Sequence, residues 1–360
     1  MIQAPQHFTA IERFRFIASD HAQAMQFMHR WEADRVKAGR KGVTALAVSG
    51  GGANGAFGAE VLVGWTHTGN RPQFDLVTGV STGALIAPLA LAGKYWDARL
   101  SNAYHSESAQ RLTYQGIGVL SRPSLYSGGS LADLIAQNTS AELLHAIAAE
   151  HRTGRRLLVA TTNLDTQQTS VWDMGSIALS AEEPGNAGQA LALFRTVLTT
   201  SASVPGIFPP ILITDGSTTE LHADGGINAP FLLLPEALTR WQIKSINLRP
   251  ERIYIIINGQ AEAHAQPLKG GALAIMGRSF ESMSRANTRI HLAVAAAFAK
   301  RHGVLLNYTE LPANIESNPL DFRAERMAAL FEIGNATAKK LYADDFGTVT
   351  VVNGQPKLAH

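Results

Sequence analysis

The chain has 360 residues, of which 46% are hydrophobic and 17% charged, and 31 Lys and Arg against 29 Asp and Glu leave a net charge of +2. This size and hydrophobic content predict a compact protein with a substantial core, and the near-neutral charge argues against nucleic acid as a partner. There is no Cys, which excludes a disulfide framework and a thiolate metal site within the chain.

The first half of the chain alternates between strand and helix patterns. We expect helix over 10–37, a strand over 43–48, helix over 55–68, a strand over 74–80 and helix over 82–92. Strand and helix alternation of this kind is typical of βαβ units. The sequence therefore predicts an α/β fold with a central, mainly parallel sheet flanked by helices.

The same alternation continues downstream. We expect strands over 157–162, 169–173 and 253–258, helices over 187–200, 270–303 and 324–343, and a loop with a hairpin over 205–222. No apolar stretch reaches the roughly 20 residues that would cross a bilayer, and the start shows no signal-peptide pattern. We expect the chain as written to be soluble, with the bacterial cytoplasm and cell envelope both open as compartments.

The strongest local motif runs from Gly79 to Gly83 and reads Gly-Val-Ser-Thr-Gly. It fits the Gly-x-Ser-x-Gly nucleophile elbow, because a strand is predicted before it and a helix after it. The two glycines allow the strand and the helix to approach closely while the serine hydroxyl points outward. Ser81 is therefore the candidate nucleophile.

A glycine-rich loop, from Ser49 to Gly55, joins the first predicted buried strand to its helix. Consecutive N–H groups in such a loop, at the positive end of a helix, can hold an oxyanion or a phosphate. Gly50, Gly52 and Gly55 also satisfy Gly-x-Gly-x-x-Gly, so nucleotide binding and a purely structural turn stay open as alternatives. Beside a serine elbow, an oxyanion hole is the better explanation.

A third motif reads His-Ala-Asp-Gly-Gly and places Asp224 before Gly225 and Gly226. Taken alone, Asp-Gly-Gly indicates only a tight turn at a strand end. The triple glycine, the serine elbow and Asp-Gly-Gly occur here in that order. Together they resemble the patatin-like phospholipases over residues 43 to 230.

This resemblance implies a Ser-Asp dyad without histidine, formed by Ser81 and Asp224, with backbone amides of Gly51 and Gly52 as the oxyanion hole. The implied reaction is hydrolysis of lipid acyl esters through an acyl-enzyme, with no metal or cofactor. The implied partners are a lipid or other acyl-ester substrate and a transient membrane surface. Asn54 departs from the family pattern, in which many relatives have Arg or Lys, and this weakens the case for a phospholipid substrate.

For the domain organisation, we expect an N-terminal helical segment over 1–40 that packs on a single patatin-like catalytic domain over 41–345, followed by a tail over 346–360. The 270–303 helix has basic and apolar side chains, so it could lie at a membrane surface or pack on the sheet. The sequence leaves the oligomeric state open.

Two other functions remain as alternatives. An α/β-hydrolase would use a Ser-Asp-His triad in that chain order, for which His264, His291 and His302 are the available histidines. A catalytically silent lipid-binding or anion-binding module would keep the elbow for architecture alone.

Overall fold

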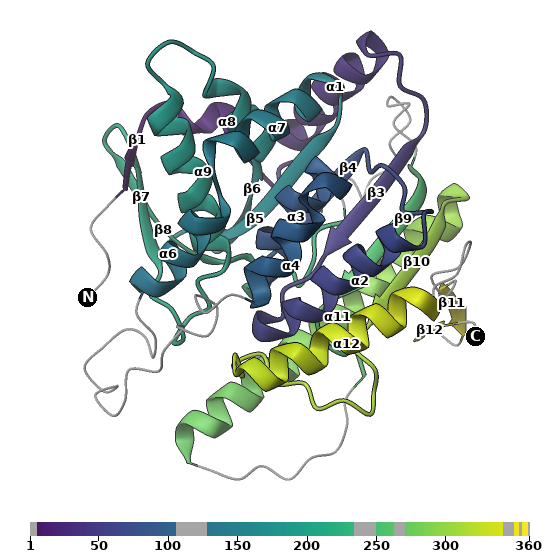
Figure 1. The fold of residues 1–360 in the computed structure, drawn as a ribbon. Helices are drawn as coiled ribbons and strands as arrows, with labels where there is room; N and C mark the ends of the chain where they lie inside the picture. The colour runs from purple at the N-terminus through teal and green to yellow at the C-terminus, as the bar shows by residue number, and fades with distance from the viewer. Residues whose placement is uncertain are drawn as a thin grey trace.

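The structure is a computed structural model that describes residues 6–105, 128–233, 250–262, 271–340, 349–352 and 355–358. A mixed sheet lies between two layers of helices, which gives the molecule three layers (Figure 1). The α/β fold class expected from the sequence is confirmed.

Ten strands of the described chain form the central sheet, whose main path runs β1-β7-β8-β5-β4-β3-β9-β10. The pairs β1/β7, β5/β4, β4/β3, β3/β9 and β9/β10 are parallel, whereas β8 is antiparallel to both of its neighbours. Their bounds are β1 Gln6–Phe8, β2 Arg15–Ile17, β3 Val43–Val48, β4 Leu76–Gly79, β5 Arg156–Asn163, β6 Gln168–Asp173, β7 Ile211–Asp215, β8 Thr218–Asp224, β9 Pro250–Ile257 and β10 Leu305–Glu310. A separate hairpin consists of β11 Val349–Val352 and β12 Gln355–Leu358.

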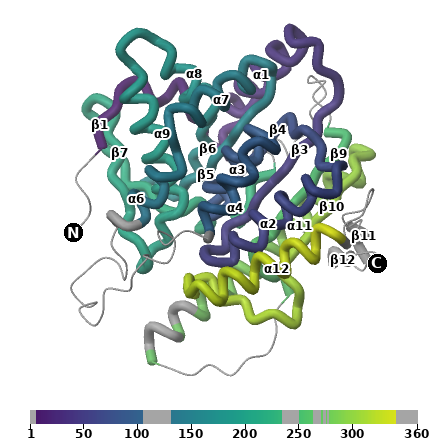
Figure 2. Tube along the Cα trace, in the orientation of Figure 1, coloured from purple at the N-terminus to yellow at the C-terminus, as the bar shows by residue number. Residues whose placement is uncertain are grey.

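One face of the sheet is covered by a large group of helices. They are α2 Gly55–His67, α3 Thr82–Ala92, α4 Asp97–His105, α6 Gly128–Asn138, α7 Ala141–Arg152, α8 Met174–Ser180, α9 Ala187–Ser201 and α12 Ala324–Lys340. Within this layer α12 lies along α2 (Figure 2). The opposite face is covered by α1 His21–Lys37 and α11 Ala272–His302.

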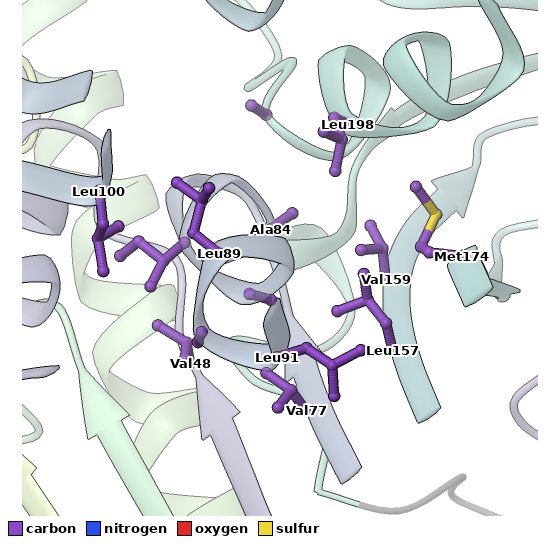
Figure 3. Packing of buried hydrophobic residues seen from close by; sticks show 14 of the residues in the cluster. Val48, Val77, Ala84, Leu89, Leu91, Leu100, Leu157, Val159, Met174 and Leu198 are labelled. Atoms are coloured by element: carbon purple, nitrogen blue, oxygen red, sulfur yellow. The ribbon is translucent and has the colours of Figure 1, made fainter. Parts of the chain in front are cut away.

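Side chains alternate between these two cores because successive residues of a strand point to opposite faces. In β3, Leu46 and Val48 belong to the core under α2 and α3, whereas Ala45 and Ala47 belong to the core under α1 and α11. Figure 3 shows part of the first core, where strand residues pack against α3, α4, α8 and α9: Val48, Val77, Ala84, Leu89, Leu91, Leu100, Leu157, Val159, Met174 and Leu198. A strand buried on both faces explains the unbroken apolar runs in the sequence.

The prediction of helix over 10–37 is wrong for its first part. Residues 15–17 form β2, which pairs antiparallel with β6 from Arg15↔Trp172 to Ile17↔Ser170, and the helix begins only at His21. The predicted hairpin before His222 is confirmed as β7 and β8, and the predicted 270–303 helix as α11. Strands β1 and β10, helix α8 (Met174–Ser180) and the helices between Asp97 and Arg152 were not predicted from the sequence.

The parallel part of the sheet brings several loops to one edge. Strands β3, β4, β9 and β10 run in the same direction, so their carboxyl ends lie together. They lead into the glycine-rich loop, the serine elbow, the segment from Asn258 to Gln260 and the loop from Leu311 to Arg323. Ligands of open α/β sheets bind outside this edge.

Candidate active site

The serine elbow has the predicted arrangement of strand, serine and helix. Ser81 lies between β4 and α3 with φ 55° and ψ −127°, a strained conformation that residues other than glycine seldom adopt. A Cβ on Gly79 would overlap the carbonyl of Gly83, and a Cβ on Gly83 would overlap the carbonyl of Val48. Both glycines are therefore required for helix α3 to start directly against the sheet.

A second serine supports this strained turn. The backbone N–H of Ser81 donates a 3.1 Å hydrogen bond to Oγ of Ser201, whose hydroxyl donates a 2.7 Å bond to the carbonyl of Ala160 in β5. Ser201 is completely buried at the end of α9. No local sequence pattern singles out Ser201, because its contact with Ser81 spans 120 residues of the chain.

Asp224 reaches the elbow from the opposite direction. β4 runs parallel to β5 and ends with Gly79 opposite Val159, whereas β8 runs antiparallel to β5 and ends with Asp224 opposite Thr161. Two strand ends therefore converge on β5, although their sequences are far apart. Ser81 and Asp224 meet at this point and line the same cavity.

The backbone of Asp224 is fixed on both sides. Its N–H donates to the carbonyl of Ser203 at 3.0 Å, and its carbonyl accepts from the hydroxyl of Thr162 at 2.9 Å. Its carboxyl Oδ1 accepts from the N–H of Gly226 at 2.7 Å. The other oxygen, Oδ2, is buried and has no hydrogen-bond partner of ordinary geometry among the described residues.

Burial raises the pKa of Asp224 to about 7, while the nearby Ser81 hydroxyl and the Gly226 N–H oppose this rise. A carboxylate with a pKa near 7 is a much better base for a hydroxyl than one with an ordinary pKa near 4. The free Oδ2 and the raised pKa together suit a general base beside Ser81.

The glycine-rich loop leaves two amides available. The N–H of Gly50 donates to the carbonyl of Pro230, but no hydrogen bond among the described residues uses the N–H of Gly51 or Gly52. Both residues line the cavity, with φ 157° at Gly51 and 55° at Gly52. A Cβ on Gly50 would stand 3.1 Å from Cβ of Ser81, so the loop lies against the candidate nucleophile.

The remaining motif glycines also mark close approaches. A Cβ on Gly55 would overlap the hydroxyl of Thr82, and one on Gly225 would overlap the carbonyl of Ala160. At Gly226, the added atom would lie 2.9 Å from Oδ1 of Asp224. Each of these three glycines therefore lets one part of the candidate site approach another.

Ser81, Asp224 and the glycine-rich loop share one cavity of about 920 Å³. Much of its wall is apolar and comes from α3, α6, α7, α9 and the loop that follows α9: Leu85, Leu89, Leu131, Leu134, Ile135, Leu143, Leu198, Ile207 and Phe208. The volume is near the upper end for small-molecule sites, and the wall suits a long apolar group.

The family model for patatin-like phospholipases matches residues 46–235, more than half of the chain. The chain belongs to the patatin-like phospholipase family. A search among curated proteins gave no match. Among solved structures, the crystal structure of VipD from Legionella pneumophila is similar with a TM-score of 0.37 and 13% identity, over 84% of this chain and 67% of VipD. Membership of the patatin-like family supports a lipid acyl hydrolase in general.

Asn54 differs from the basic residue of many patatin-like proteins and has a structural contact here. Its Nδ2 donates to the hydroxyl of Ser317 at 3.0 Å, and the N–H of Ala53 donates to the carbonyl of Pro319 at 2.9 Å. These bonds hold the glycine-rich loop against the loop that precedes α12. A Cβ on Gly52 would overlap the same Pro319 carbonyl.

Among the described residues, neither His291 nor His302 reaches the cavity that Ser81 and Asp224 line. His291 contacts the carbonyl of Asn287 in its own helix, and the ring of His302 packs on Phe298. His264 lies outside the described residues. No histidine is among the described residues that line the cavity, so the alternative Ser-Asp-His triad has no observed geometry to support it.

In the part of the chain that the structure describes, no helix combines the length and the hydropathy needed to cross a bilayer.

Proposed function

We propose that this protein hydrolyses carboxylic esters of lipids with Ser81 as nucleophile and Asp224 as its only catalytic partner. The observation that carries the proposal is the buried, unpartnered Oδ2 of Asp224 beside a serine held in the strained elbow conformation. Family membership supplies the substrate class.

In the first step, the carboxylate of Asp224 accepts the proton of the Ser81 hydroxyl while Oγ attacks the ester carbonyl carbon. The tetrahedral intermediate collapses as Asp224 returns the proton to the leaving alcohol, which gives an acyl-serine. Asp224 then takes a proton from water as that water attacks the acyl carbon. The second intermediate collapses as Asp224 returns this proton to Oγ of Ser81, which releases the fatty acid and restores both residues.

The oxyanion of both intermediates would bind at the N–H groups of Gly51 and Gly52. Three observations support this role. Gly51 and Gly52 line the cavity, their N–H groups have no acceptor among the described residues, and both residues lie before the N-terminus of α2. One such donor contributes about 3 kcal/mol to transition-state stabilisation. The apolar wall of the cavity would hold the acyl chain, and contact with a lipid surface would be transient.

The test is a panel of short and long chromogenic esters and phospholipids, hydrolysed by the wild type and by variants. We expect Ser81→Ala and Asp224→Asn each to lower kcat by at least a thousandfold with an unchanged fold in circular dichroism. A matched control is Asp133→Asn, which changes an exposed carboxylate of α6 that does not line the cavity.

Substantial activity of Asp224→Asn would contradict the dyad. Hydrolysis of short soluble esters alone would reduce the proposed function to that of an esterase. A folded wild type that hydrolyses no ester and reacts with no serine-directed probe would instead favour the silent binding module.

A further inference from the structure

Helix α11 has an apolar face that the protein core does not use. Ile275, Met283, Ile290 and Val294 are exposed to 54%, 60%, 59% and 45%, respectively. Their spacings of eight, seven and four residues place them on one side of the helix. We name these four residues the α11 stripe.

Packing of α11 on the sheet does not account for this stripe. The face that packs is a different one, with Leu292, Ala295, Ala296 and Ala299 buried in the core shared with α1. A surface helix of a globular protein normally has one apolar face and one polar face. The exposed stripe therefore suggests a second environment for α11.

The charges of α11 lie mostly away from the stripe. Arg278 and Arg285 both pair with Glu281, and Arg289 donates to the carbonyl of Ala261. At 100° per residue, Arg278, Arg285, Arg289 and Glu281 all fall outside the arc occupied by the stripe. Only in the last turn do exposed cations, Lys300 and Arg301, occur near it. Such a surface suits an uncharged apolar partner with polar edges, and it offers an acidic peptide few contacts.

The stripe continues directly into the candidate active site. Ile275 and Met283 line the cavity that holds Ser81, together with Phe280 of the same helix and Leu320 of the loop before α12. All four are partly or largely exposed, so they form part of the mouth of the cavity. In Figure 1 the first turns of α11 project beyond the neighbouring elements.

From these observations we propose that the α11 stripe docks on a lipid surface and places the mouth of the cavity against it. The inference rests on the proposed function, because a lipid ester must leave its aggregate to reach Ser81. The stripe runs over 20 residues, from Ile275 to Val294, which is about 29 Å of helix lying along the surface. Burial of four apolar side chains is the driving force, so zwitterionic lipid is sufficient for binding.

The experiment measures binding to phosphatidylcholine vesicles by flotation, in a Ser81→Ala background that leaves the lipid intact. The test variant is Ile290→Ser/Val294→Ser, because neither residue lines the cavity. We expect this variant to lower vesicle partitioning at least tenfold. A control, Val36→Ser/Tyr95→Ser, removes two apolar side chains from other elements that are even more exposed, and it should bind like its parent.

With Ser81 present, Ile290→Ser/Val294→Ser should hydrolyse a soluble butyrate ester within twofold of the wild type but lose at least tenfold in activity on vesicle lipid. Unchanged partitioning, or an equal loss in the control, would overturn the inference. A third outcome would also overturn the inference: sedimentation shows that the wild type is a dimer and the test variant a monomer, while both bind vesicles equally. Failure of the proposed function is distinguishable, since the wild type would then bind vesicles but hydrolyse no ester.

Discussion

Asp224 is a buried carboxyl group whose burial is tolerated because its backbone and one oxygen are held by hydrogen bonds. The remaining oxygen has no hydrogen bond of ordinary geometry in the part of the chain that the structure describes, and burial raises the pKa of the group to about 7. A residue placed only for stability would gain from a partner at that position. The nearby Ser81 hydroxyl is the group that acts on this carboxyl at the cavity, which fits the proton-accepting role proposed for Asp224.

The raised pKa of Asp224 predicts the pH dependence of catalysis. The base must be ionised to accept the Ser81 proton, so kcat/KM for a soluble ester should rise tenfold per pH unit and level off above an apparent pKa of about 7. Rates measured from pH 5 to pH 9 will show this. A profile that is already flat from pH 5 would contradict the assignment of Asp224 as the base.

The same shift predicts a pH-dependent stability. Because the folded-state pKa lies above the ordinary value of 3.8, the protonated carboxyl stabilises the fold at low pH, and this contribution is lost as pH rises through about 7. Asp224→Asn has no such loss. We therefore expect the difference in free energy of unfolding between Asp224→Asn and the wild type, measured with urea, to shift in favour of the variant by up to about 4 kcal/mol between pH 4 and pH 8. A difference that stays constant with pH would show that the pKa of the Asp224 carboxyl is not raised.

Ser201 is predicted to position the nucleophile. Ser201→Ala removes the acceptor of the Ser81 N–H, so the strained turn relaxes, and kcat should fall ten- to a hundredfold with little change in KM. Thr200→Val is the matched control, because it removes a buried hydroxyl that bonds only to the carbonyl of Thr196 in its own helix. Equal losses in both variants would indicate a general packing defect instead.

Elements with a continuous local pattern could be predicted from the sequence, and elements that depend on distant partners could not. The strand, serine and helix around Ser81 follow from glycine spacing and an apolar run. Residues 15–17 were predicted as helix because they adjoin a helical pattern. Their strand conformation depends on pairing with Ser170 to Trp172, more than 150 residues away. Local periodicity has no information about such a partner.

Helix α6 contributes to the apolar wall of the cavity, so it is expected to influence which acyl-chain lengths the protein accepts. Leu134 and Ile135 lie in the cavity wall, and both are largely buried. Leu134→Trp should fill part of the apolar space and lower kcat/KM for a long-chain ester at least tenfold relative to a butyrate ester. Chromogenic esters of increasing length measure this ratio. A uniform effect on all lengths would show that α6 does not contact the acyl chain.

At the scale of the whole molecule, the order of motifs in the sequence indicated the family, but the cavity and its lining residues could not be predicted from the sequence. Ser81, the glycine-rich loop and Asp224 lie at the ends of three strands that meet only when the sheet forms. The contacts of Ser201, Ser203 and Ser317 with these motifs likewise depend on the assembled sheet and its loops. We propose that residues 41–345 form one catalytic domain, since both cores draw on strands and helices from across this range. The segment before residue 41 packs on it and adds β1 and β2 to the sheet and side chains to both cores.

The central claim is that Asp224 activates Ser81 without a histidine. Its most direct test is the rate at which a fluorophosphonate probe modifies the protein, followed by intact mass and peptide mapping at pH 8. We predict a single modification on Ser81 in the wild type and a rate at least a hundredfold lower in folded Asp224→Asn. Modification of Asp224→Asn at the wild-type rate, or of a residue other than Ser81, would contradict the account.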